Sequence, residues 1–181
     1  MRALARARFA LCFAVSLCAS CVQPEDQPLD DQDPHQPGDA LGFFSVTGKL
    51  GDDTCGAESL AAPGQWVFQV KLSREGSTLY WLNGREAIVG DIDSHGSFGF
   101  ETHLDLPLEE QHGAVKGCTV VRRDSASGTL DGTKSFSGVL TYSYAEAKGT
   151  DCSALPLGSS GLPRLLPCSL TYALSGARVS E

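Results

Sequence analysis

The sequence predicts an all-β fold, an antiparallel up-and-down meander of about eight or nine strands that closes into a small barrel, with a curled β-sandwich as the alternative. From residue 41 onward, apolar and polar residues alternate with a period of two, which is typical of half-buried strands. Glycine-containing turn signals separate these segments, and none shows the 3.6-residue apolar stripe of an amphipathic helix. Because no crossover helices are available, a parallel sheet is excluded and neighbouring strands are expected to pair antiparallel.

The alternation is clearest in residues 135–144, SFSGVLTYSY, where Phe136, Leu140, Tyr142 and Tyr144 share one face and serine and threonine occupy the other. Other segments repeat this pattern over shorter lengths. Each is therefore predicted to be a strand with one buried face. The nine predicted strands are 43–50, 66–73, 77–82, 86–92, 97–104, 118–124, 128–131, 135–144 and 168–177.

Five residue pairs are predicted to reverse the chain. Asn83-Gly84 is the strongest hairpin signal, because both central residues of a type I′ turn need a positive φ. The four other predicted reversals are Glu75-Gly76, His95-Gly96, Ser127-Gly128 and Asp131-Gly132. Successive tight turns imply that consecutive strands are neighbours in the sheet.

The amino terminus has the pattern of an export signal. Arg2, Arg6 and Arg8 precede an apolar run of 11 residues, from 9 to 19, and small residues then lead into Cys21. This run is too short to span a bilayer, which takes about 20 residues in a helix. Its length suits the apolar region of a secretory signal peptide.

The segment Leu17-Cys18-Ala19-Ser20-Cys21 resembles the signal of bacterial lipoproteins, in which an apolar and two small residues precede a lipidated cysteine. The resemblance implies that residues 1–20 are removed and that Cys21 carries a diacylglycerol on its sulfur and an acylated amino group. Cys18 departs from the pattern, since it stands where leucine is usual. In that family, Asp after the cysteine often signals inner-membrane retention, so Val22 implies the outer membrane.

Cys18 and Cys21 also form a C-x-x-C pair, which can serve redox chemistry or zinc binding. A redox pair opens a helix in a βαβ unit, and a zinc site needs two further ligands at matched spacing. Neither context is present around residues 18–21. The lipidated cysteine is therefore the favoured interpretation.

Residues 21–40 are predicted to form a disordered tether between the anchor and a single β domain at 41–181. Residues 22–40 hold four prolines and six acids, without lysine or arginine, so burial cannot offset their ordering entropy. The whole chain has a formal net charge of −8. Residues 1–20 contain three arginines and no acid, so their removal makes the remaining chain more negative. Such a chain lacks the clustered cations that nucleic-acid binding requires, so we expect no nucleic-acid partner.

Four cysteines remain once Cys12, Cys18 and Cys21 are set aside, and an even number in an exported protein predicts two disulfides. The count of nine alternating strands places Cys55 and Cys118 at one rim, and Cys152 and Cys168 at the other. We therefore predict the disulfides Cys55–Cys118 and Cys152–Cys168. A four-cysteine zinc site is disfavoured because the spacings contain no C-x-x-C knuckle.

Three patterns bear on chemistry, and each also suits an ordinary structural role. Asp91–Gly96 begins like a calcium loop but lacks its later ligands, so a hairpin turn is favoured. In residues 101–112, His103, Asp105, Glu109, Glu110 and His112 could hold a metal or supply acid–base groups, although solvated charges on a strand's polar face and a loop are the favoured interpretation. No nucleophile elbow or phosphate-binding loop occurs. We therefore expect no enzyme, no cofactor and no metal site.

The predicted function is that of a lipid-anchored, non-enzymatic binding or interaction module at the outer membrane. Its rim loops, above all residues 146–167, would contact an unknown protein. The alternative is a lipocalin-like carrier of a small apolar ligand. Inward-facing aromatic residues either line a ligand pocket or, as we favour, fill the core: Trp66, Phe68, Phe98, Phe100, Phe136, Tyr142, Tyr144 and Tyr172.

Overall fold

The computed structural model describes residues 37–56, 60–84, 87–110, 117–154 and 162–179. The predicted signal peptide, the lipidation site Cys21 and nearly all of the tether therefore lie outside the described residues. All strands belong to one compact unit, residues 31–181. Among the described residues, none forms a helix long and apolar enough to cross a membrane.

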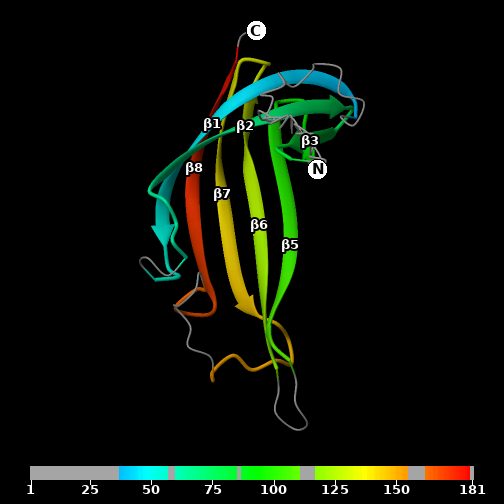
Figure 1. Cartoon of the computed structure of the whole chain (residues 1–181). Helices are drawn as coiled ribbons and strands as arrows, with labels where there is room; N and C mark the ends of the chain where they lie inside the picture. The colour runs from blue at the N-terminus through cyan, green and yellow to red at the C-terminus, as the bar shows by residue number, and fades with distance from the viewer. Residues whose placement is uncertain (1–36, 57–59, 85–86, 111–116, 155–161, 180–181) are drawn as a thin grey trace, which may run out of the picture. The chain divides into compact units, whose positions relative to one another are not determined.

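The described chain forms an eight-stranded barrel in which each strand pairs antiparallel with the next and β8 pairs with β1 (Figure 1). The up-and-down meander and its closure into a barrel are confirmed, and the curled sandwich does not form. Alternating residues of each strand point inward because the side-chain period of a strand is two. The strands are β1 (Asp39–Asp53), β2 (Gln65–Glu75), β3 (Thr78–Leu82), β4 (Ile88–Ile92), β5 (Ser97–Glu109), β6 (Cys118–Asp131), β7 (Ser135–Glu146) and β8 (Cys168–Arg178).

The predicted reversal at Ser127-Gly128 is wrong, and the two strands predicted at 118–124 and 128–131 are one strand, β6. Gly128 faces Gly138 of β7, and a Cβ on Gly128 would lie 2.8 Å from the Cα of Gly138 and 2.8 Å from the ring of Phe98. The glycine is thus needed for close approach of backbone and ring rather than for a turn. The strand count falls from nine to eight.

The predicted reversals at Gly76, Gly96 and Gly132 are confirmed. These glycines have φ values of 61°, 85° and 56°, which an L side chain rarely adopts. They connect β2 to β3, β4 to β5 and β6 to β7. The Asn83-Gly84 pair lies between β3 and β4 as expected, although residues 85–86 of that connection lie outside the described residues.

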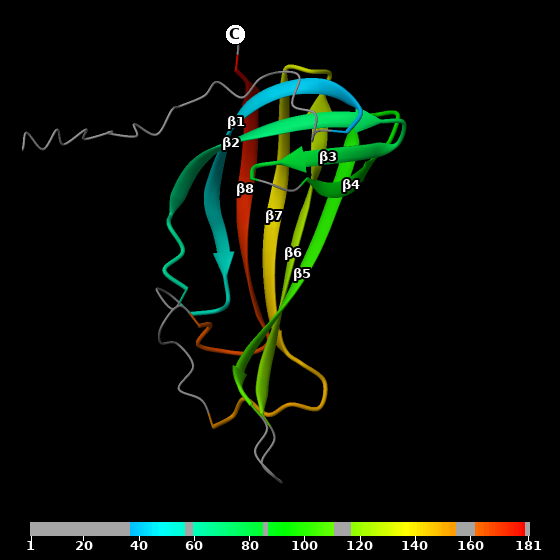
Figure 2. The same cartoon turned by 45° about the vertical axis from the view of Figure 1, so that its right-hand side comes forward.

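The hydrogen-bonded ring is complete over only part of the barrel. β3 and β4 have five residues each, whereas the other strands have 11 to 15. β3 pairs with residues 71–75 of β2, and β4 pairs with residues 98–100 of β5. Residues 65–70 of β2 and 101–109 of β5 therefore pair on one side only, and Figure 2 shows β3 and β4 beside one end of the longer strands.

We call the part of the barrel that contains β3 and β4 the closed half, and the remainder the open half. The interior of the closed half is filled by aromatic rings together with aliphatic side chains such as Leu72 and Leu79. Phe136 is 3% exposed, and its ring centroid lies 5.6–5.9 Å from those of Phe44, Trp81 and Phe98. Such tilted and edge-to-face contacts stabilise a core beyond their buried area.

The disulfide prediction is wrong: the bonds are Cys55–Cys168 and Cys118–Cys152. With eight strands instead of nine, the parity argument places all four cysteines at the rim of the open half. Neighbouring strands then decide the pairing. Cys55 follows β1 and Cys168 begins β8, which pairs with β1.

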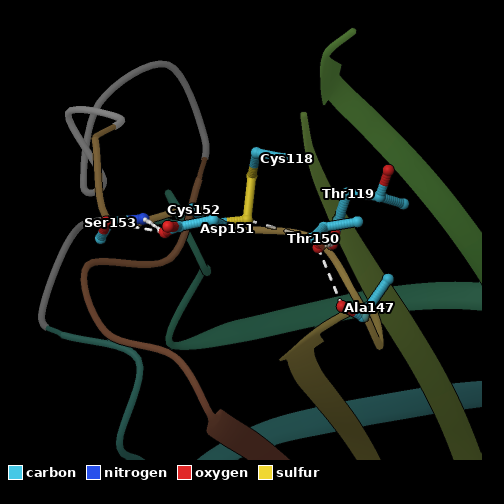
Figure 3. The surroundings of a disulfide bond; sticks show 7 residues. All are labelled: Cys118, Thr119, Ala147, Thr150, Asp151, Cys152 and Ser153. Atoms are coloured by element: carbon cyan, nitrogen blue, oxygen red, sulfur yellow. Dashed lines mark hydrogen bonds between the residues drawn. A yellow bond between two sulfur atoms is a disulfide. The ribbon is translucent and has the colours of Figure 1, made fainter. Parts of the chain in front are cut away.

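Cys118 begins β6, and Cys152 follows the end of β7, its neighbour (Figure 3). Beside this disulfide the Thr150 hydroxyl donates to the Ala147 carbonyl at 2.9 Å. The Asp151 amide donates to the Gly117 carbonyl at 3.0 Å. The segment after β7 is thereby held against the start of β6.

Candidate binding site

A cavity of about 290 Å³ lies inside the open half. Its wall comes from the start of β2 and β8, the end of β7, the start of β6 and the β1–β2 connection. Six of its ten lining residues belong to strands. The lining residues are 60–63 together with Trp66, Arg122, Tyr142, Tyr144, Leu170 and Tyr172.

Aromatic rings form most of the strand-borne wall. The Trp66 ring stacks on Phe68, with centroids 4.6 Å apart, and meets Tyr172 edge-on at 5.3 Å. Tyr172 in turn meets Tyr142 edge-on at 6.2 Å. These contacts hold the rings against one another, so the cavity has a largely preformed apolar surface.

Trp66 can lie flat on the sheet because its partner on β1 is Gly48. A Cβ on Gly48 would be 2.5 Å from Trp66 Nε1. This close approach buries Nε1, and no described residue accepts a hydrogen bond from it. The position of the indole is thus set by packing and not by a hydrogen bond.

The β1–β2 connection covers one side of the cavity. Residue Ala61 has a φ of 50°, and the Tyr172 hydroxyl donates to the Pro63 carbonyl at 3.1 Å. A left-handed conformation in a residue other than glycine costs about 1–2 kcal/mol. The connection is also held by a hydrogen bond from the Leu50 amide to the Gly64 carbonyl at 2.9 Å.

An ion pair stands on the inner face of β6. Arg122 donates from Nε and from one Nη to the two carboxylate oxygens of Asp124, at 2.7 and 2.6 Å. The guanidinium also lies over the Tyr142 ring, 4.6 Å from its centroid. Burial lowers the pKa of Arg122, but the hydrogen bonds and charge of Asp124 more than offset this and raise it, so Arg122 stays charged.

Two phenol hydroxyls of the cavity wall have no partner within the part of the chain that the structure describes. Tyr142 and Tyr144 alternate on the inner face of β7, and neither hydroxyl makes a hydrogen bond to a described residue. Burial raises the pKa of both groups above the ordinary value of 10.0. Both therefore remain protonated donors at neutral pH.

A smaller cavity of about 80 Å³ lies next to the ion pair, where the open half meets the closed half. Trp81, Phe100, Thr102 and Asp124 are among its lining residues. Arg122 borders the larger cavity and Asp124 the smaller one. The ion pair is therefore the polar boundary between the two spaces.

The calcium-like segment Asp91–Gly96 is a hairpin turn, as the sequence favoured. Asp93 Oδ1 accepts hydrogen bonds from the amides of His95 and Ser97, at 2.8 and 2.9 Å. These two backbone bonds lower the pKa of Asp93. The carboxylate is thus engaged in shaping the turn between β4 and β5.

The acidic and histidine residues of 101–112 do not come together. His103 and Asp105 lie on the exposed face of β5, and Glu109 ends the strand. His112 lies outside the described residues. No group of three or more metal-ligating side chains occurs in the described ranges.

Seven of the eight aromatic residues divide between the two expected roles, and the partly buried Phe68 contacts both Trp66 and Trp81, with ring centroids 4.6 and 6.0 Å away. Phe98, Phe100 and Phe136 are buried in the closed half and fill it as favoured. Trp66, Tyr142, Tyr144 and Tyr172 instead line the cavity of the open half. The prediction of a packed core therefore holds for the closed half of the barrel, and the alternative of a pocket lining holds for the open half.

The inward ion pair was not predicted as part of a site. A signal was nevertheless present, because Arg122 and Asp124 share the strand parity of the buried residues Cys118 and Val120. Charged residues at inward positions are rare and mark a polar function or a paired charge. Arg123, the other member of the basic pair, points outward, 3.5 Å from Glu101.

No family model, curated protein or solved structure matches this chain. The class that the fold and the site define is a small antiparallel β-barrel with an aromatic-lined cavity at one end.

Proposed function

We propose that this chain is an exported, lipid-anchored binding module whose barrel holds a small, largely apolar molecule in the cavity of the open half. The observation that carries the proposal is the cavity itself, about 290 Å³ and walled mainly by aromatic and aliphatic side chains. Small-molecule sites begin at about 300 Å³ and combine an apolar wall with a few polar groups. The open half has both, and we propose binding without catalysis.

The open half also supports a route of entry. Residues 65–70 of β2 and 101–109 of β5 each have a strand neighbour on one side only, so no strand pair has to separate for a ligand to enter. Leu104 has the strand parity of the buried Phe98 and Phe100, yet it is 53% exposed. An apolar residue exposed on an inner face is expected where the barrel wall is incomplete.

The anchor belongs to the proposal on the strength of the sequence. A diacylglycerol on Cys21 and an acylated amino terminus would supply two or three chains, enough for stable membrane attachment. The acidic segment 22–40 would then separate the barrel from the membrane surface. Val22 favours the outer membrane as the site of attachment.

Two measurements test the binding proposal. Native mass spectrometry of the protein purified from its host should show a bound small molecule, and the uncharged probe N-phenyl-1-naphthylamine should bind with a stoichiometry of one per chain. Tyr142→Ala should weaken probe binding, whereas Tyr80→Ala, on the outer face of β3, should not. A protein without bound molecule that also fails to bind the probe would overturn the proposal.

The anchor is tested separately. Cys21→Ala should abolish incorporation of labelled palmitate and release the protein from the membrane fraction, because the acyl chains supply the attachment. Cys18→Ala is the matched control and should leave labelling intact. Labelling that depends on Cys18, or persists in the Cys21 variant, would contradict the assignment.

Protein interaction through the loop after β7 is the second candidate function. Residues 155–161 of that loop lie outside the described residues, but Leu165 is described and 60% exposed. The neighbouring residue Arg164 is tied to the barrel by a hydrogen bond from its amide to the Cys55 carbonyl at 2.8 Å. Crosslinking in the host should capture a partner at Leu165 and lose it in Leu165→Asp if this candidate is correct.

A further inference from the structure

The cavity of the open half has a polar end as well as an apolar wall. The hydroxyls of Tyr142 and Tyr144 border the space without a hydrogen-bond partner among the described residues. Arg122 uses Nε and one Nη for Asp124, which leaves its other Nη without a partner in the same part of the chain. Three side chains with unused hydrogen-bond donors thus border one cavity.

All three groups are placed by the pairing of neighbouring strands. Arg122 of β6 is opposite Tyr144 of β7, and Tyr142 is one step along the same inner face. The guanidinium lies 4.6 Å from the centroid of the Tyr142 ring. The donors are therefore neighbours across one strand pair.

Both hydroxyls would need an acceptor once a ligand fills the cavity. Tyr144 is 9% exposed and its hydroxyl, unlike Trp66 Nε1, is not fully enclosed, so a ligand that encloses it must replace the solvation that the hydroxyl loses. In contrast, the hydroxyl of Tyr172 in the same wall donates to Pro63. An oxygen acceptor brought by a ligand would satisfy Tyr142 and Tyr144 together.

We propose that the ligand is a compact aromatic compound that carries one anionic oxygen group, a carboxylate or sulfonate, and that Tyr142, Tyr144 and Arg122 receive this group while the rings of Trp66 and Tyr172 contact the aromatic body. The inference rests on the proposed binding function and names the ligand class. Hydrogen bonds from a guanidinium or a phenol to an anionic oxygen are stronger than those between neutral groups. The acceptor group would thus orient a ligand that the apolar wall alone would hold in several poses.

Asp124 is what limits the ligand to a single anionic group. Its carboxylate already takes two of the donors of Arg122, so the pair is close to neutral. A ligand with two or more negative charges would face Asp124 without a second cation among the described lining residues. The geometry therefore selects acids with one charge over phosphates and dicarboxylates.

Two probes of nearly equal shape separate the parts of this inference. 8-Anilinonaphthalene-1-sulfonate carries a sulfonate, and N-phenyl-1-naphthylamine has the same aromatic body without it. The wild-type protein should bind the sulfonate about tenfold or more tightly than the uncharged probe, as hydrogen bonds to a charged group predict. Calorimetry should give one sulfonate per chain, displaced by the uncharged probe.

The variants Tyr142→Phe and Tyr144→Phe remove one hydroxyl each and keep the rings. Each should weaken binding of the sulfonate about tenfold and change binding of the uncharged probe less than about twofold. Tyr80→Phe, whose hydroxyl faces Glu75 on the outside, is the matched control and should alter neither. Near-ultraviolet circular dichroism verifies that each variant keeps the native packing.

The outcomes are distinguishable. If neither probe binds, the proposed binding function fails and this inference fails with it. If both probes bind equally, or if the two variants weaken both equally, the cavity binds apolar molecules but the acceptor site is overturned. Selective loss of sulfonate binding in both variants supports the inference.

Discussion

In the closed half of the barrel Phe136 lies over Gly176 and touches three other aromatic rings, whereas in the open half Trp66 lies over Gly48 and borders a cavity. The local arrangement is the same, since in both an aromatic ring covers a glycine on the neighbouring strand. The two halves differ in the number of strands that surround the ring. β3 and β4 complete the ring over one half only.

The comparison shows that strand length, and not only residue type, decides whether an aromatic interior becomes core or binding site. Eight strands enclose an interior just wide enough for side chains to fill. Where two of the eight are missing, the wall no longer surrounds the rings. The open half is instead tied at its rim by Cys55–Cys168 and Cys118–Cys152.

The largest expected effect comes from the cross-links of the open half. The double variant Cys55→Ser/Cys168→Ser releases a sequence separation of 113 residues and should destabilise the protein by about 4.7 kcal/mol in the chain-entropy model. Cys118→Ser/Cys152→Ser releases 34 residues and should cost about 3–4 kcal/mol. Urea unfolding measures both.

Hydrogen exchange would sharpen this result. Protection should fall first in residues 65–70 and 101–109, whose strands pair on one side only. If protection fell first in the closed half, or if the shorter cross-link proved the more important, the division into two halves would be wrong.

The next effect tests the closed half. A Cβ at Gly176 would clash with three atoms of the Phe136 ring, so Gly176→Ala should destabilise the protein by about 1–3 kcal/mol through overpacking. Gly99→Ala is the matched control because a Cβ there meets nothing within 4 Å, and it should change stability by less than about 0.5 kcal/mol. Thermal unfolding of both variants measures this difference. Equal unfolding temperatures for Gly176→Ala and Gly99→Ala would contradict a fully packed closed half.

The same substitution in the open half should behave differently. In Gly48→Ala the new Cβ would displace Trp66, but the cavity gives the indole room to move. We expect a destabilisation below about 1 kcal/mol, smaller than that of Gly176→Ala, together with weaker binding of N-phenyl-1-naphthylamine. A loss of stability as large as that of Gly176→Ala would show that the open half is packed as tightly as the closed half.

The smallest effect is on pH dependence. Burial raises the pKa of Tyr142, Tyr144 and Tyr172 above 10.0, because it disfavours the phenolate. The folded state then holds these protons more tightly than the unfolded state. Their contribution to stability is complete below pH 10 and is lost as the pH rises through the pKa of the folded state.

Phenolate absorbance in the native protein should therefore develop at a higher pH than in the urea-unfolded protein. The pKa of the fourth tyrosine, Tyr80, is also raised, by desolvation and by the charge of Glu75, so the pKa values of all four tyrosines shift in the same direction. Native and unfolded titrations that coincide would contradict the buried placement of the cavity tyrosines.

Some of this architecture could be read from local pattern. The inward faces of β2 and β7 were correct because a strand's alternation is visible within a few residues. Lys71 and Ser73, on the other face of β2, are also buried, which the alternation does not predict. The turns at Gly76, Gly96 and Gly132 were correct because positive φ is a property of the turn itself. The disulfides were not, since one glycine interpreted as a turn changed the strand count and moved two cysteines to the wrong rim.

The candidate site was only half visible. The aromatic residues of the wall were identified, but which of them line a cavity depends on where β3 and β4 end relative to β2 and β5. The role of Arg122 and Asp124 depends likewise on the position of β6 in the ring. Neither is a property of any single segment.

Local alternation and turn chemistry are enough to predict the all-β class, the inward residues and the order of a meander. The continuity of β6, the common rim of all four cysteines and the opening of half of the aromatic interior emerge only in the folded barrel. Those features depend on pairing between strands distant in the chain, where a difference of a few residues in strand length leaves a wall complete or incomplete.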